Sequence, residues 1–295
     1  MKKPLRILTV DFEDWFHILD HPETRYPEQW SRYESRIEQN VDRLLALFDK
    51  HSVRATWFCL GWSAERFPAL VQRIAAHHQI ACHTYGHQLL FQQSPAAFKE
   101  DTLKAKNILE DTIGRPVDTF RAAGFSVTRT TPWFFEALRS CGFTVDSSVF
   151  VARRNHGGFP EFGGEGPCRI QTSAGELLEL PLSPLHKFGR PFIYSGGGYF
   201  RLLPYPWIRS AFQSADYTMT YFHPRDIDAG QPILTTLPIR RKFMSYYGLK
   251  GCFRKLDVLL TDFDFLSVAA AAEELQKHQL PVRQFRNDNT MVTIG

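Results

Sequence analysis

The stretch that decides the fold is LRILTVDFED, residues 5–14. It begins as an apolar, β-branched run and then becomes acidic, which is typical of a buried strand with polar side chains at its carboxyl end. Ser35 and Glu38 have the spacing of a capping box, so we expect a helix to begin there. Apolar residues from Ile37 to Phe48 then keep the spacing of a helix that packs on a sheet. A strand followed by a helix is the unit of an α/β protein.

This unit repeats along the N-terminal two-thirds of the chain. Further strands are expected at residues 54–60, 79–82, 119–122, 144–147, 177–182 and 217–222. Further helices are expected at residues 63–77, 94–114, 131–142, 250–260 and 265–275. We therefore predict an α/β fold with a parallel, barrel-like core, in which residues 1–230 form the barrel and residues 231–295 a C-terminal extension packed on it.

Composition excludes several classes of protein. Of 295 residues, 43% are hydrophobic and 22% charged, which is ordinary globular usage and argues against disorder or a coiled coil. The net charge of +4 is scattered along the chain, so a dedicated nucleic-acid binder is not expected. Five widely spaced cysteines without a CxxC pair indicate buried thiols and no zinc knuckle.

The N-terminus and the apolar runs bear on where the protein works. The run before Asp11 is too short and too soon acidic for a signal peptide, and no uncharged apolar stretch reaches ~18 residues. We expect a cytoplasmic protein without a transmembrane segment, peripheral to the inner membrane if the basic residues 240–242 touch lipid. A solvated helix face explains those residues equally well.

Polar side chains follow the predicted strands at their carboxyl ends, where β/α folds gather working residues. They are Asp11, Glu13, Asp14, His83, His87, Arg121, Asp146 and His223. Two histidines at i and i+4 on a helical turn, with one carboxylate, would give three metal ligands and an open position for water. Each residue alone has a bland explanation, such as a cap, a surface cation or a core histidine. Together they favour a hydrolytic metal site.

The ordered motifs resemble one known family. They are VDFEDWFH (10–17), HTYGH (83–87), FRAAGFS (120–126), DSS (146–148) and FHP (222–224). In this order they resemble the NodB-homology polysaccharide deacetylases, or family 4 carbohydrate esterases. Together with residues 196–204 and the tail 249–265, they look most like the exopolysaccharide deacetylases associated with exosortase gene clusters. The resemblance implies a single compact domain, a distorted (β/α) barrel of about seven strands, which binds a divalent metal and deacylates a sugar.

The resemblance also implies ligands for the metal, which we expect to be Zn²⁺ because imidazole and carboxylate are mixed. His83 and His87 would be two of them. The third is Asp14 or Glu13, because the family's two adjacent aspartates are separated here. We prefer Asp14, which lies beyond the strand where the backbone can turn toward the histidines, although strand parity places Glu13 on the same face as Asp11. A second departure is Ala123-Gly124, where the family usually has a proline.

Catalytic roles follow from the same resemblance. Asp11 would be the general base on water, with Arg121 holding its carboxylate ionised and oriented. His223 would protonate the leaving amine, and Asp146 would hold that imidazole or only line the groove. The aromatic residues expected to stack on sugar faces are Trp15, Phe125 and Tyr199, although core packing explains them equally well.

The expected function is removal of N-acetyl groups from amino sugars of a bacterial polysaccharide or its lipid-linked precursor. A sugar deformylase or an allantoinase-like amidohydrolase on the same scaffold is the nearer alternative. A non-catalytic carbohydrate-binding member is the alternative from another class. The motif residues argue against it, because a binding protein needs neither a base nor an acid around a metal.

Overall fold

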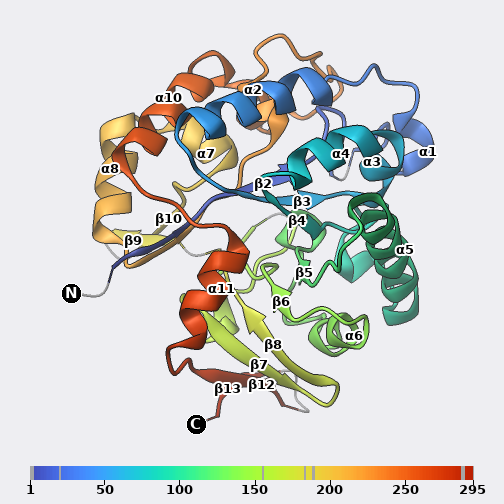
Figure 1. The fold of residues 1–295 in the computed structure, drawn as a ribbon, viewed down its shortest axis with the longest axis vertical. Coiled ribbons are helices and arrows are strands. Elements are labelled where there is room, and N and C mark those ends of the chain that lie inside the picture. The colour runs from blue at the N-terminus through green and yellow to red at the C-terminus, as the bar shows by residue number, and fades with distance from the viewer. Residues whose placement is uncertain are drawn as a thin grey trace.

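The computed structural model describes residues 3–19, 21–154, 156–182, 184–187, 190–286 and 290–294. Its centre is a nine-stranded sheet in the order β13-β12-β7-β8-β6-β5-β4-β3-β2, surrounded by helices (Figure 1). The strands are β1 (Leu5–Ile7), β2 (Thr9–Phe12), β3 (Thr56–Cys59), β4 (Gln79–Cys82), β5 (Thr119–Phe120), β6 (Val145–Asp146), β7 (Cys168–Thr172), β8 (Gly175–Glu179), β9 (Leu185–Lys187), β10 (Arg190–Phe192), β11 (Tyr217–Met219), β12 (Val282–Phe285) and β13 (Met291–Thr293).

The helices cover the outside of this sheet. They are α1 (Pro27–Trp30), α2 (Ile37–Lys50), α3 (Gly61–Arg66), α4 (Pro68–Ala75), α5 (Pro95–Ile113), α6 (Phe134–Ser140), α7 (Gly197–Leu202), α8 (Tyr205–Ser214), α9 (Ile239–Tyr246), α10 (Leu249–Asp262) and α11 (Val268–Gln276). Short 3₁₀ turns occur at η1 (Leu90–Gln92), η2 (Ala123–Phe125), η3 (Pro160–Phe162) and η4 (Pro224–Ile227).

The sheet curls so that its first strand meets a later one. From β2 to β6, and on to β8, each strand is parallel to the next. At the other edge, β1 pairs in parallel with β11, and the bridge between Val10 and Phe222 continues this pairing alongside β2. The predicted α/β fold with a distorted (β/α) barrel is confirmed. Its curvature brings the carboxyl ends of β2, β4, β5 and β11 to one mouth.

Local sequence signals explain where several helices begin and end. The hydroxyl of Ser94 accepts from Ala97 N and starts α5, while Gly114 ends it in the left-handed conformation (φ 67°), as a helix-stop glycine should. The expected helix 63–77 is two helices, because Pro68 lacks an N–H and forces Phe67 out of helical geometry (φ −126°). The expected capping box is also wrong: Arg36 is the N-cap of α2, and Ser35 donates to Asp14 instead.

The C-terminal residues close one edge of the sheet. β12 pairs in parallel with β7, β13 pairs antiparallel with β12, and α10 packs against η4 and α7. A barrel of residues 1–230 with an extension of residues 231–295 stays a prediction. Within the described residues, no helix combines the length and the apolar character needed to cross a bilayer.

Candidate active site

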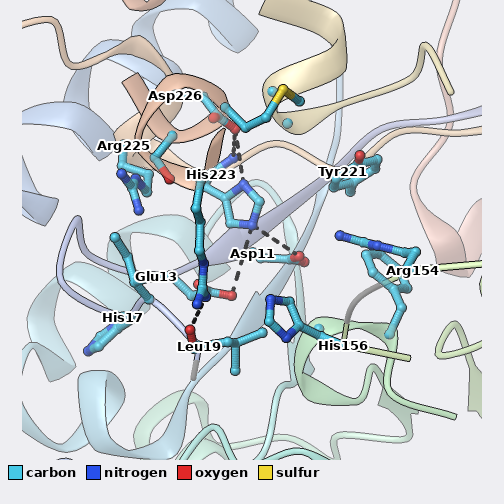
Figure 2. A pocket seen from close by; sticks show the side chains of 18 of the residues that line it. Asp11, Glu13, His17, Leu19, Arg154, His156, Tyr221, His223, Arg225 and Asp226 are labelled. Carbon is cyan, nitrogen blue, oxygen red and sulfur yellow. Dashed lines mark hydrogen bonds and ion pairs between the residues drawn. The ribbon is translucent and has the colours of Figure 1, made fainter. Parts of the chain in front are cut away.

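A pocket of about 370 Å³ opens where the parallel strands end (Figure 2). Asp11 and Glu13 enter it from the end of β2, and His87 from the turn after β4. His223 and Asp226 enter it from the start of η4. Residues from three segments far apart in the chain therefore share one cavity.

Glu13 and two histidines form a compact ligand-type group. Glu13 Oε1 lies 3.1 Å from His83 Nε2 and 3.1 Å from His87 Nε2. Burial would raise the pKa of Glu13, but His87 and His83 outweigh it, and the pKa falls well below its ordinary value. The carboxylate is thus held ionised between the two imidazoles.

A strained turn, and not the expected helical turn, brings the two histidines together. Residues 83–87 form a bend after β4, in which Thr84 (φ 66°) and His87 (φ 51°) adopt the left-handed conformation. Asp101 of α5 fixes this bend, because its carboxylate accepts from the backbone N–H groups of Tyr85 (2.8 Å) and Gly86 (2.9 Å). The two imidazoles lie close together, with ring centres 5.1 Å apart, but on a bend where the sequence predicted a helical turn. Their role as metal ligands stays a prediction.

Asp14, our preferred ligand from the sequence, does not face the histidines. Its carboxylate accepts from Trp15 N (2.8 Å), from Arg36 N (3.1 Å) and from the hydroxyl of Ser35. It therefore anchors the start of α2. The period of two along an extended chain explains the result, since Glu13 shares the face of Asp11 and Asp14 does not. The structure favours Glu13 over Asp14 as the third ligand.

The geometry of this group fits a divalent metal. Ligand atoms of Glu13, His83 and His87 all lie within 4.8 Å of one another. His83 Nδ1 lies 2.7 Å from Arg121 O, and donation to that carbonyl leaves the lone pair on Nε2 free to bind an ion. His87 Nε2 is buried and, despite its short distance to Glu13, has no hydrogen-bond partner. A buried nitrogen of this kind needs a partner, which a metal would supply.

Asp11 is held by a buried arginine. Arg121 Nη1 donates to Asp11 Oδ1 over 2.6 Å and to Thr9 Oγ1 over 2.8 Å. Its other nitrogens donate to the carbonyl (3.2 Å) and hydroxyl (3.1 Å) of Ser147. Arg121 is completely buried, so the pair has one fixed geometry, with the second oxygen of Asp11 directed into the pocket.

His223 lies beside Asp11 and Glu13 and is held by Asp226, a carboxylate that we did not predict from the sequence. His223 Nε2 lies 3.7 Å from Asp11 Oδ2 and 4.0 Å from Glu13 Oε1, and Nδ1 lies 3.0 Å from Asp226 Oδ2. Burial would lower the pKa of His223, but Asp226, with Glu13 and Asp11, raises it to about 9. Asp226 is in turn paired with Arg201 Nη1 at 2.6 Å. The imidazole therefore carries a proton that it can give away.

Asp146, predicted to orient His223 or line the groove, does neither. It is fully buried, and Oδ1 accepts from the hydroxyl of Ser148. Its neighbour is Glu179, whose Oε1 accepts from Val149 N at 3.1 Å. Burial raises the pKa of both carboxyls, that of Asp146 to about 6, as expected for two acids in one dry site. The pair supports the strand ends behind Arg121.

The three aromatic candidates differ. Trp15 is 4% exposed, packs edge-on against Phe16 and Tyr33, and donates from Nε1 to Glu34 O, so no face is left for a sugar. Phe125 touches the pocket but is mostly buried. Tyr199 is 41% exposed and lines the pocket, so it alone of the three offers a ring to a ligand.

Sequence reasoning missed Asp226 and Asp101, although one signal was present. Asp226 follows His223 by three residues, and its side chain accepts from His223 N as an N3 residue does in a capping box. Asp101 lies inside a long helix with no local pattern that marks it. Taken together, the pocket offers a metal-ligand group, the carboxylate of Asp11 and a protonated imidazole. Ligand atoms of Asp11, Glu13 and His223 lie within 4.8 Å of one another, an arrangement that suits hydrolysis of an amide.

Comparison with known proteins gives the chain two family matches. Residues 26–145 match a family described as Polysaccharide deacetylase, and residues 147–273 match one described as Domain of unknown function (DUF3473).

Two curated relatives align with part of the chain. A peptidoglycan deacetylase of Helicobacter pylori is 29% identical over 124 residues, which are 42% of this chain and 41% of that protein. A peptidoglycan-N-acetylglucosamine deacetylase of Bacillus cereus is 37% identical over 99 residues, 33% of this chain and 32% of that protein. The aligned part is therefore less than half of either relative.

A solved structure extends the similarity in fold. It is a Mycobacterium smegmatis protein described as a polysaccharide deacetylase, with a TM-score of 0.65 and 18% identity, covering 95% of this chain and 93% of that one. The barrel is thus shared across nearly the whole chain.

Proposed function

We propose that the chain is a metal-dependent hydrolase that removes N-acetyl groups from amino sugars, because residues 26–145 match the polysaccharide deacetylase family. The observation that carries this proposal is the arrangement of Asp11, Glu13 and His223. A ligand group, a base and an acid converge in one pocket, and only a reaction needs all three.

Glu13, His83 and His87 would hold the metal, and we propose Zn²⁺. When bound there, such an ion polarises the amide carbonyl and acidifies water. Side chains of the protein carry out the two proton transfers. Asp11, held in place by Arg121, takes the proton from the attacking water. Protonated His223, held by Asp226, gives its proton to the leaving nitrogen as the C–N bond breaks.

The products distinguish this reaction from the nearer alternatives. We propose to incubate the protein with N-acetylglucosamine oligomers and with N-formyl amino sugars and allantoin, and to measure acetate, formate and ureide products. Chelator-sensitive acetate release supports the deacetylase. Formate or ureide products without acetate would replace it with another C–N hydrolase. No product from a protein with bound metal would favour the non-catalytic member.

We propose a bacterial exopolysaccharide, or its lipid-linked precursor, as the substrate, and place the chain in the exosortase-associated branch on the motifs quoted above. One surface supports the precursor. Ile239 (82% exposed), Phe243 and Tyr247 lie four residues apart and form one outward face beside α9. Met244 of the same helix lines the pocket.

The same helix also carries cations, because Arg240 is exposed and Lys242 is half-buried beside this outward face. Apolar and basic residues together are what an anionic bilayer surface binds. We propose that α9 rests on the cytoplasmic face of a membrane and brings the pocket to a lipid-linked sugar.

A further inference from the structure

The walls of the pocket carry more positive than negative charge. The lining arginines are Arg153, Arg154, Arg201, Arg225 and Arg241, and the lining carboxylates are Asp11, Glu13 and Asp226. Each of these carboxylates already has a cationic or metal-ligand partner within the protein. In the described part of the chain, no carboxylate lies within ion-pair distance of Arg153, Arg154 or Arg225. These three arginines could therefore bind an anion that is not part of the protein.

Among these three arginines, Arg154 contacts three aromatic rings that line or border the pocket. Its guanidinium carbon lies 4.6 Å from the ring centre of Phe150, 5.4 Å from that of Phe125 and 6.0 Å from that of Tyr221. Three aromatic rings thus fix the side chain through cation–π contacts. Its Nη1 is buried and has no hydrogen-bond partner. A buried N–H without an acceptor is costly, so this group is prepared for an acceptor that the protein does not provide.

The backbone around Arg154 is built to hold it close to the site. Arg154 N donates to Gly157 O (3.2 Å) in a tight bend, and Gly157 (φ 147°) and Gly158 (φ 88°) have conformations that favour glycine. A Cβ atom on Gly157 would collide with the backbone of Phe125. Figure 2 shows the guanidinium of Arg154 turned toward Asp11 and His223, on the side of the pocket away from Arg225.

We propose that Arg154 forms an anion subsite, so that the amino sugar deacetylated here carries, or is linked to, a carboxylate or phosphate group. A guanidinium matches the paired oxygens of either group, and a neutral N-acetylhexosamine polymer offers neither. Exposed Arg153 adds positive charge at the mouth of the pocket. This inference rests on the proposed function for the reaction, but the charge preference is a property of binding and is measured apart from turnover.

The test is equilibrium binding by calorimetry to the full chain, treated with chelator so that nothing turns over. The probes are chitotetraose, which is neutral, a hyaluronan tetrasaccharide, which alternates glucuronate with N-acetylglucosamine, and N-acetylglucosamine with and without a 1-phosphate. We expect an anionic probe to bind at least about tenfold more tightly than its neutral counterpart, with an affinity that falls as salt rises. A preference for the tetrasaccharide identifies a carboxylate, and one for the 1-phosphate identifies a phosphate.

Variants test whether Arg154 causes the preference for anionic probes. Arg154→Gln should abolish the preference, while Arg129→Gln, which removes one exposed charge elsewhere, should keep it. Arg154→Lys keeps the charge without the fork and should retain part of the preference, which covers the case in which the glutamine variant does not fold. Equal affinity for neutral and anionic probes, or equal losses in the Arg154 and Arg129 variants, would overturn the proposal. A charge preference without acetate release in the metal-loaded protein would leave the subsite standing and remove the deacetylase.

Discussion

Asp226→Asn tests the coupling on which proton donation by His223 depends. In the wild-type protein the pKa of His223 is raised to about 9, chiefly by Asp226 against the effect of burial, so about 97% of the imidazole is protonated at pH 7.5. Asparagine removes the charge, and the pKa should fall toward the ordinary 6.5, where about 9% is protonated at the same pH. From protonation alone we expect kcat/KM at pH 7.5 to fall about tenfold.

The assay is the pH profile of kcat/KM for acetate release by metal-loaded wild type and variant. His223 is needed in its protonated form, so activity is present below its pKa and lost as pH rises through it. The basic limb should therefore move down by about 2.5 pH units in the variant. The bound metal ion affects the pKa of His223 in both proteins. The quantity to measure is therefore the difference between the two pH profiles.

Asp228→Asn is the matched control. Asp228 is buried two residues from Asp226, but its partner is Arg36, with 2.6 Å between Oδ2 and Nε. Both variants leave an arginine without its carboxylate, and for buried Arg201 the cost is about 3–5 kcal/mol of unfolding free energy, so folding is checked by circular dichroism. An unmoved basic limb in Asp226→Asn, or an equal shift in Asp228→Asn, would refute the reasoning.

Three further outcomes are expected. Asp11→Asn should keep its metal, measured by elemental analysis, while turnover falls by about 10²–10⁴; full activity would remove Asp11 from the base role. Asp101→Asn should weaken metal binding about 10–100-fold in competition with a chelator, because Asp101 fixes the bend that carries His83 and His87, whereas exposed Asp111→Asn on the same helix should not. The protein should sediment with vesicles that contain phosphatidylglycerol and not with vesicles of pure phosphatidylcholine. The double variant Ile239→Ser, Phe243→Ser should lose this binding, and the control variant Val258→Ser on α10 should retain it. Equal binding by the wild type and both variants would exclude α9 as the membrane contact.

Elements with local signals could be predicted from the sequence. β4 occupies residues 79–82 as expected, and α5 begins and ends at Ser94 and Gly114, because caps and apolar period act within a few residues. β7, β12 and β13 were not predicted. They carry polar residues such as Arg169, Gln171 and Gln284, and the pairing of β12 with β7 joins segments more than 100 residues apart. A pattern within one short segment holds no record of such partners.

The site was predictable to the extent that strand ends define it. Asp11, His83, Arg121 and His223 were found because polar residues at the carboxyl ends of parallel strands share one mouth. Strand order does not reveal which neighbours touch, so Asp146 was expected to hold His223 or to line the groove, although it faces Glu179.

Two sequence arguments disagreed on the third metal ligand. Strand parity pointed to Glu13, and the argument from the turn beyond the strand pointed to Asp14. The structure follows parity, because Asp14 is used to anchor α2.

The most direct test of the account is metal content per chain, measured together with acetate release, in wild type, Glu13→Ala and Asp14→Ala. We predict about one ion per chain and chelator-sensitive acetate release in the wild type, loss of both in Glu13→Ala, and retention of the ion in Asp14→Ala, since only Glu13 faces the histidines. A wild-type protein that binds no ion after reconstitution, or a Glu13→Ala variant that keeps both ion and activity, would contradict the metal site on which the proposed reaction depends.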